Sequence, residues 1–208
     1  YPEELKRLAD MPLVLYVDGD ISRIKDKISI GIVGTRQPSY DSTCIARTVA
    51  GDLASAGAAV ISGGALGIDS AAHEGAVAAG GVTVCVMGCG LGCDYLRDNE
   101  PLRRRIRETG ALISEFTPLS SASRTTFPIR NRIISGISHG VLVVEAGEKS
   151  GSLITAKRAS EQGREVFAIP GSVLASAYMG VNRLIMDGAR AVTSAADILA
   201  PYAAMYPD

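Results

Sequence analysis

The chain has 208 residues, of which 47% are hydrophobic, so it can bury the core of one large domain or two small ones. Its formal net charge of −1 argues weakly against nucleic acid, because many DNA-binding domains are basic overall. No apolar run could cross a bilayer and the first residues do not form a signal peptide, which predicts a cytoplasmic protein without membrane contact. The chain does not begin with Met, and we expect it to be part of a longer protein.

Short β-branched runs alternate with Ala-rich amphipathic segments along most of the chain. Strands are predicted at residues 29–33, 58–62, 82–87, 111–114, 141–145, 165–169 and 191–193. Helices are predicted at residues 42–56, 68–79, 100–108, 129–138, 153–162 and 181–187. Several strands are apolar at nearly every position, as in a parallel sheet covered by helices on both faces. The pattern predicts an α/β fold with an extended Rossmann-like, doubly wound, mostly parallel sheet.

The residues before the first predicted strand form a separate segment. We expect residues 1–28 to be an N-terminal leader that docks on the core, partly through the apolar run at residues 13–17 (LVLYV). Residues 29–208 then form the Rossmann-like domain, because no internal repeat or low-complexity linker interrupts them.

Three consecutive predicted strands end in glycine-rich loops. The first is followed by Gly34-Thr35-Arg36, the second by Ser62-Gly63-Gly64 with Gly67 close behind, and the third by residues 88–92 (GCGLG). Ligands of such sheets bind beyond the carboxyl ends of the strands, where glycine lets backbone approach and helix N-termini attract phosphate. One such loop is common for packing alone, but three in succession favour a phosphate ligand. Their spacing matches neither the dinucleotide fingerprint nor the Walker motif.

The segment at residues 127–132 (FPIRNR) combines an aromatic ring with basic side chains. Phe127, Arg130 and Asn131 lie within it, and Arg124 precedes it by three residues. Guanidinium groups bind phosphate bidentately, and an aromatic ring beside a basic groove can stack on an unpaired base. Phe127 could equally be a core residue.

An alternative explanation for the arginines of this segment is structural. Arg130 and Arg132 could pair with Glu115 and Glu145, which lie near the ends of neighbouring predicted strands. Both interpretations of these two arginines stay open.

Other polar clusters have simpler structural explanations. Asp69 and His73 lie one turn apart on a predicted helix, and we favour a hydrogen bond that fixes the preceding loop over acid–base chemistry. Residues 103–107 (RRRIR) are interpreted as a solvated helix face. The turn containing Ser150 and Gly151 is first a helix cap, and second a set of phosphate-binding amides.

The four cysteines do not suggest a disulfide scaffold. Cys85, Cys89 and Cys93 are spaced by four residues, which differs from the spacing of metal-binding cysteine pairs. We therefore expect reduced, buried thiols at a strand end and no metal site.

Motifs along almost the whole chain resemble those of the DNA-processing protein A family, also called the Smf family, and they occur in family order. They are residues 32–36 (IVGTR), 62–73 (SGGALGIDSAAH), 127–136 (FPIRNRIISG), 143–146 (VVEA), 150–156 (SGSLITA) and 167–171 (FAIPG). The resemblance implies an extended Rossmann domain, residues 29–208, that binds single-stranded DNA and loads the RecA recombinase onto incoming DNA during natural transformation. It implies a binding protein rather than an enzyme, without a cofactor. It also implies a homodimer, to which the apolar stretch at residues 178–186 could contribute.

The loops and the resemblance together predict a set of DNA-binding residues and no catalytic ones. The set is Gly34, Thr35, Arg36, Ser62, Gly63, Gly64, Gly67, Arg124, Phe127, Arg130, Asn131, Ser150 and Gly151.

Two alternative functions come from different classes. The chain could be a nucleotide N-glycosidase of the lysine-decarboxylase-like phosphoribohydrolase type, with Arg130 and Glu145 acting at the sugar. Against this, the chain lacks the P-G-G-x-G-T-x-x-E motif of those enzymes. It could also be a self-associating scaffold whose glycine loops serve packing only.

Overall fold

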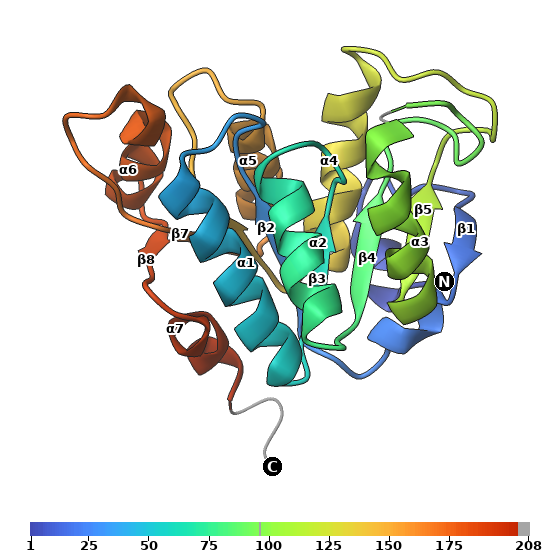
Figure 1. Ribbon diagram of the computed structural model, residues 1–208, viewed down its shortest axis with the longest axis horizontal. Helices are drawn as coiled ribbons and strands as arrows, with labels where there is room; N and C mark the ends of the chain where they lie inside the picture. Colours follow the sequence, from blue (N-terminus) through green and yellow to red (C-terminus); the bar gives the residue numbers. More distant parts are fainter. Residues whose placement is uncertain (96, 204–208) are drawn as a thin grey trace.

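A computed structural model describes residues 1–95 and 97–203. Its sheet has the strand order β1-β5-β4-β3-β2-β6-β7-β8, and every neighbouring pair is parallel except β1 with β5 (Figure 1). This confirms the predicted doubly wound, mostly parallel sheet. The strands are β1 (Tyr16–Gly19), β2 (Ser29–Val33), β3 (Ala59–Ser62), β4 (Thr83–Val86), β5 (Ala111–Ser114), β6 (Gly140–Val143), β7 (Glu165–Ala168) and β8 (Arg190–Ala191).

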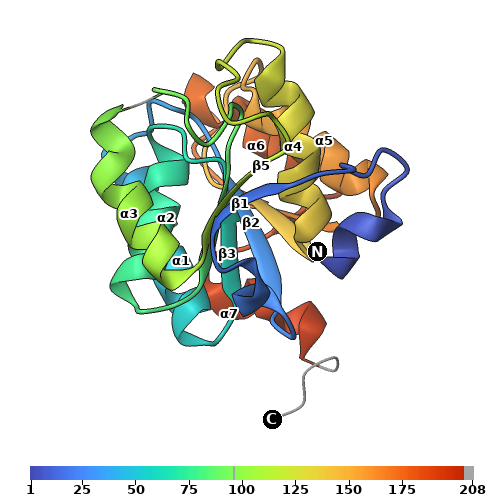
Figure 2. The same ribbon diagram turned by 90° about the vertical axis from the view of Figure 1, so that its right-hand side faces the viewer.

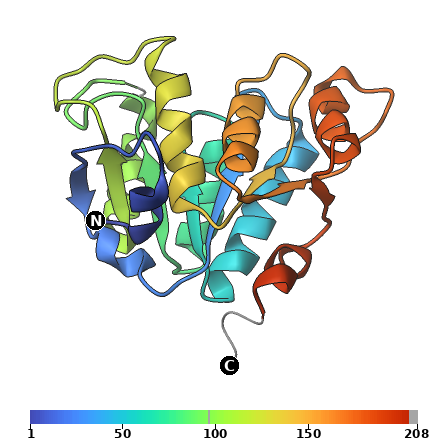
Figure 3. The ribbon, with the colours of Figure 1, turned by 180° about the vertical axis from the view of Figure 1, so that it is seen from behind.

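Helices cover both faces of the sheet. They are α1 (Tyr40–Ser55), α2 (Ile68–Ala78), α3 (Glu100–Thr109), α4 (Thr126–Ile137), α5 (Ser152–Glu161), α6 (Met179–Met186) and α7 (Ala195–Leu199). Helices α1, α2, α3 and α7 pack on one face, and α4, α5 and α6 pack on the other (Figures 1 and 3). Because the side chains of a strand alternate between faces, each central strand contributes to two separate apolar clusters. Among the described residues, no helix is long and apolar enough to cross a membrane.

The N-terminal segment differs from its prediction. Leu13 and Val14 are 88% and 57% exposed, so the expectation that residues 13–17 dock on the core was wrong for them. Leu5, from the short 3-10 helix Glu3–Arg7, is instead fully buried against the core. The unpredicted strand β1 adds antiparallel to β5 at the edge of the sheet (Figure 2). The division at residue 28 stays a prediction, and residues 204–208 of the expected domain lie outside the described residues.

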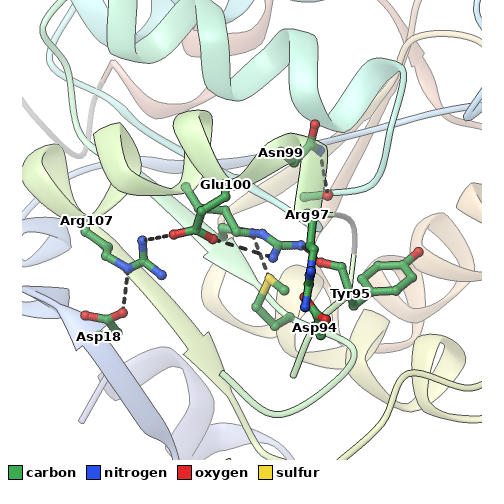
Figure 4. A network of polar contacts seen from close by, with 11 residues as sticks. Asp18, Asp94, Tyr95, Arg97, Asn99, Glu100 and Arg107 are labelled. Carbon is green, nitrogen blue, oxygen red and sulfur yellow. Dashed lines mark hydrogen bonds and ion pairs between the residues drawn. The ribbon is translucent and has the colours of Figure 1, made fainter. Parts of the chain in front are cut away.

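The arginine-rich helix α3 is only partly a solvated face. Arg107 donates to Asp18 of β1 at 2.5 Å and to Glu100 at 2.7 Å (Figure 4). Arg103 is buried and donates to the backbone oxygen of Tyr95 at 2.5 Å. The solvated interpretation was therefore wrong for these two arginines, which join α3 to its neighbours, whereas the intervening residues 104 and 105 are exposed.

The sheet contains a topological switch point between β2 and β6. Strand β2 pairs with β3 on one side and with β6 on the other. The chain leaves β2 into α1 on one face of the sheet, and it leaves β6 toward α5 on the opposite face. The loops that follow these two strands therefore diverge, which opens a crevice at their carboxyl ends.

The Asp69–His73 pair does not form. His73 is fully buried, and its Nδ1 lies 2.8 Å from Oγ1 of Thr83 on β4. Asp69 accepts a long hydrogen bond from the backbone nitrogen of Ala65, at 3.4 Å, and so fixes the loop by itself. Burial, with a smaller effect of the Arg130 charge, lowers the pKa of His73 to about 3.

We predict that the buried His73 makes the protein less stable in acid. An unfolded histidine takes up a proton near pH 6.5, whereas the folded one does so only near pH 3. The unfolded state therefore binds more protons between these two pKa values. As the pH falls from 7 to 4, the free energy of unfolding should fall by roughly 3 kcal/mol. Urea unfolding at intervals from pH 7 to pH 4 measures this loss.

The variant His73→Gln removes this contribution, so its stability should depend less steeply on pH than that of the wild type. His139→Gln is the comparison variant, because His139 is only half-buried, although burial lowers its pKa as well. Equal pH slopes for wild type and His73→Gln would contradict the prediction.

Candidate functional site

The crevice at the switch point forms a pocket of about 450 Å³. Four segments line it: the loop after β2, the first half of α4 with the residues before it, the turn and start of α5, and the start of α2 with the loop before it, through Asp69 and Ala65. The structure brings together most of the residues that the sequence predicts for DNA binding, namely Gly34, Thr35, Arg36, Arg124, Phe127, Arg130, Asn131, Ser150 and Gly151.

Phe127 lies at the centre of this pocket, in the first turn of α4. Its ring is half-buried and lies 5.5 Å from the ring of Tyr95, centroid to centroid. The guanidinium carbon of Arg36 lies 4.9 Å from the Phe127 centroid, and that of Arg130 lies 5.9 Å away. A Cβ atom at Gly88 would come within 2.6 Å of the same ring. The ring is thus packed on Gly88, yet it still borders the pocket.

Arg130 lines the pocket and is almost fully buried. It is 4% exposed, and its Nη1 donates to the backbone oxygen of Val86 at 2.7 Å. Within the described part of the chain it has no ion pair, and its buried Nε lacks a hydrogen-bond partner. Burial lowers its pKa, although the nearby Asp69 carboxyl group opposes that shift. A buried cation with so little compensation favours an anion in the pocket.

The carboxyl group of Asp69 lies in the pocket wall, near the Arg130 guanidinium. Burial raises the pKa of its carboxyl group, and the Arg130 charge acts in the opposite direction. Asp69 and Arg130 therefore reduce each other's cost of burial without direct contact. Sequence reasoning had assigned Asp69 to the loop and missed its place beside Arg130, because no spacing rule relates α2 to α4.

In the second glycine loop Ala65 lines the pocket, but Ser62, Gly63 and Gly64 do not. Ser62 is fully buried and donates to the backbone oxygen of Ile32 at 2.6 Å. A Cβ atom at Gly63 would overlap the guanidinium of Arg130, and one at Gly64 would lie 2.5 Å from the sulfur of Cys85. The two glycines therefore have a packing role: Gly63 makes room for the Arg130 side chain, and Gly64 makes room for Cys85 of β4. The predicted DNA contacts of Ser62, Gly63 and Gly64 stay a prediction.

Gly67 has a comparable packing role. Its φ is +83°, and a Cβ atom there would lie 2.5 Å from the backbone oxygen of Thr35. That oxygen accepts a hydrogen bond from Ile68 at 3.2 Å, so the second loop presses against the first one. Gly67 supports the pocket-lining loop rather than lining the pocket.

The structural explanation of the arginines paired Arg130 and Arg132 with Glu115 and Glu145. One such ion pair forms. Arg132 is 2.6 Å from Glu115 and 3.3 Å from Asp10, which confirms a structural role for Arg132. Arg130 does not pair with Glu145. Arg124 is exposed at the edge of the pocket, in the segment before α4.

The turn before α5 also lines the pocket. Helix α5 begins at Ser152, whose backbone nitrogen donates to Oγ of Ser150 at 3.4 Å. Ser150 and Gly151 precede this helix, as predicted, and the helix N-terminus borders the pocket. Ile154 and Thr155, in the first turn of α5, also line the pocket. Sequence reasoning missed both residues, although they lie within one helical turn of Ser152 and so near the predicted site.

Glu145 binds the first loop and does not line the pocket. Its Oε2 accepts hydrogen bonds from the backbone nitrogen of Ser39, at 3.0 Å, and from Oγ of Ser39, at 2.8 Å. Its backbone oxygen accepts from the nitrogen of Thr35 at 2.8 Å. The arrangement does not match the glycosidase alternative, in which Glu145 and Arg130 would both face a sugar.

Two of the three cysteines near β4 are buried, as predicted, whereas Cys93 is only partly buried. All four are free, and Cys85 and Cys89 are buried. Burial raises the pKa of the Cys85 thiol to about 12 and that of Cys89 to about 11, so both stay protonated at neutral pH. Across residues 1–95 and 97–203, no group of three His, Cys, Asp or Glu side chains is placed to hold a metal ion.

Known proteins resemble the chain in sequence. Residues 1–203 match the family of DNA recombination-mediator protein A. The DNA processing protein DprA of Bacillus subtilis is 42% identical over 198 residues, which are 95% of this chain and 67% of that protein. Protein Smf of Escherichia coli is 42% identical over 200 residues, which are 96% of this chain but only 53% of that protein.

Solved structures resemble it as well. DprA of Streptococcus pneumoniae superposes with a TM-score of 0.91 at 40% identity, covering 96% of this chain and 70% of that one. DprA of Helicobacter pylori, whose structure reports a unique single-stranded DNA binding mode, gives 0.89 at 29% identity, covering 99% and 94%. A molybdenum cofactor binding protein of Rippkaea orientalis shares the fold alone, at 0.62 and 17% identity. By its match over residues 1–203 and these relatives, the chain belongs to the DNA recombination-mediator protein A family.

Proposed function

We propose that the chain binds single-stranded DNA, without sequence preference, in the pocket at the β2–β6 switch point. The observation that carries the proposal is the half-buried ring of Phe127, which borders the pocket and has two guanidinium groups near it. The carbon of the Arg36 guanidinium lies 4.9 Å from the ring centroid, and that of the under-compensated Arg130 lies 5.9 Å away. Phosphate would bind the arginines, and an unpaired base would stack on the ring. The single-stranded DNA mode reported for the H. pylori relative supports this choice of ligand.

Arg36 and the base would compete for the same ring. The Arg36 guanidinium lies over the Phe127 ring, with its carbon 4.9 Å from the ring centroid. A base stacking there would displace it toward the neighbouring phosphate, where a guanidinium forms stronger, bidentate hydrogen bonds. DNA binding would thus exchange a cation–π contact for one stacking contact and one phosphate contact.

The wider activity follows from the family and is part of the proposal. The chain would load RecA onto incoming single-stranded DNA in natural transformation, as a binding protein without catalysis. A homodimer is supported by exposed apolar side chains on and before α6, among them Leu174 and Met186, which are 95% and 77% exposed. The glycosidase alternative is not proposed further, because Glu145 is engaged with Ser39.

We predict that the protein prefers single-stranded to double-stranded DNA. Stacking on Phe127 needs a base that is not paired, whereas phosphate contacts alone would bind both forms. Filter binding of one oligonucleotide, alone and annealed to its complement, should show tighter binding of the single strand at every salt concentration. Equal affinities would contradict the proposed function.

Arg36→Ala and Arg124→Ala should each remove one phosphate contact. Each should therefore lower the magnitude of the salt slope for a single strand by about 0.7 units or less. Arg104→Ala is the matched control, because Arg104 is exposed on α3, outside the pocket. If Arg104→Ala lowers the slope as much as the other two, only diffuse charge is acting.

Phe127→Ala should weaken binding by roughly 1–3 kcal/mol with little change in the salt slope, because stacking involves no counterion. Phe127→Leu is the comparison variant, since leucine keeps much of the packing on Gly88 but lacks an aromatic face. Circular dichroism checks that each variant is folded. Wild-type affinity of Phe127→Leu would show that the ring serves packing only.

A further inference from the structure

Tyr178 connects the start of α6 to the loop that carries Arg36. Its hydroxyl oxygen lies 3.1 Å from Oγ of Ser39 and 2.9 Å from Oγ of Ser42. Ser39 is the residue before α1, and its Oγ also donates to Oε2 of Glu145 at 2.8 Å. These hydrogen bonds form one network, which joins residues more than 130 positions apart in the sequence.

The direction of each hydrogen bond in this network follows from the number of hydroxyl hydrogens. The single hydroxyl hydrogen of Ser39 goes to the Glu145 carboxyl group, so Ser39 can only accept from Tyr178. The Tyr178 hydrogen is then used, and the Ser42 hydroxyl donates to the Tyr178 oxygen. Each hydroxyl group has a partner for its hydrogen, and the network ends on a carboxyl oxygen of Glu145. Such a fully satisfied network fixes its members in one arrangement.

Tyr178 itself is held rigidly by its surroundings. Its ring packs on Gly171, where a Cβ atom would overlap it. Gly171 is clamped by Asn182, which accepts from its nitrogen at 3.2 Å and donates to its oxygen at 3.0 Å. The next residues are fastened to the end of β6, because Ala146 accepts from the nitrogen of Gly180 at 2.8 Å. The ring is therefore a fixed point from which the Arg36 loop can be positioned.

The loop carrying Arg36 is fixed at both ends by Glu145, and Tyr178 contacts one of these ends, at Ser39. The nitrogen of Thr35 donates to the backbone oxygen of Glu145, and Ser39 binds the side chain of that same residue. Arg36 itself has no ion pair among the described residues, so its placement over Phe127 depends on the loop.

We propose that Tyr178 is a positioning residue of the DNA pocket, acting through Ser39 and Glu145 on the loop that carries Arg36. The inference rests on the proposed function, since the ligand of the pocket is single-stranded DNA. It gives a role to the segment at residues 170–182, which contributes no residue to the pocket wall.

The test combines an affinity cycle with hydrogen exchange. Tyr178→Phe removes the hydroxyl group and with it the hydrogen bonds to Ser39 and Ser42. It should weaken binding of a short oligothymidylate about three- to tenfold, the usual effect of the one bond, to Ser39, that reaches the Arg36 loop. In an Arg36→Ala background the same change should alter affinity less than about twofold, because the side chain being positioned is gone. Without DNA, the amides of residues 35–39 should exchange several-fold faster in Tyr178→Phe.

Tyr16→Phe is the matched control, because Tyr16 lies on β1, at the opposite edge of the sheet. It should leave both affinity and exchange unchanged. Equal loss of affinity from Tyr178→Phe in both backgrounds would overturn the proposal, and so would unchanged exchange at residues 35–39. If the wild type does not bind the oligonucleotide, the proposed function fails, while the exchange measurement still decides whether Tyr178 holds the loop.

Discussion

The carboxyl end of β6 holds the site together. Within two residues, Glu145 and Ala146 bind the loop after β2 through the nitrogens of Thr35 and Ser39, and the start of α6 through the nitrogen of Gly180. Strand β6 can do this because it pairs with β2 while its own helix lies on the other face of the sheet. The crevice left by this divergence is the pocket. Its walls come from distant parts of the chain that meet only because the sheet is wound in two directions.

The second constraint is the burial of Arg130. A guanidinium with one carbonyl partner and no ion pair is costly to bury, and the surrounding residues are arranged to accommodate it. Gly63 leaves space for it, Asp69 lies near enough to oppose the shift of its pKa, and His73 stays neutral. A phosphate in the pocket would supply the missing compensation. The same residue thus explains both why this loop needs glycine and why the pocket favours an anion.

Sequence reasoning predicted the central fold because its signals are local. The six parallel strands from residue 29 to residue 168 begin and end within two residues of their predicted bounds. Strand β1 was missed because Tyr16–Gly19 is mostly exposed and has no apolar alternation, so only its pairing with β5 defines it. Helix α7, with five residues, is too short to show a helical period.

For the site, sequence reasoning found the loops but could not assign each glycine. Glycine next to a ligand and glycine beneath a buried arginine give the same local pattern, and Gly63 proved to be the second kind. The links made by Glu145 and Tyr178 depend on tertiary contacts between residues more than 30 positions apart, which no spacing rule contains. The ring of Phe127 packs on Gly88 and also lines the pocket, so its role in stacking stays a prediction.

The central claim, that single-stranded DNA lies in the pocket between the ends of β2 and β6, can be tested by photocrosslinking. A short oligonucleotide containing 5-iodouracil is bound to the full chain, irradiated, and the attached peptides are identified by mass spectrometry. The account predicts crosslinks in the segment around Phe127 and in the loops around residues 34–36 and 150–155, with Phe127 itself as the main site. Crosslinks confined to α3 or α6, with none at these segments, would contradict it.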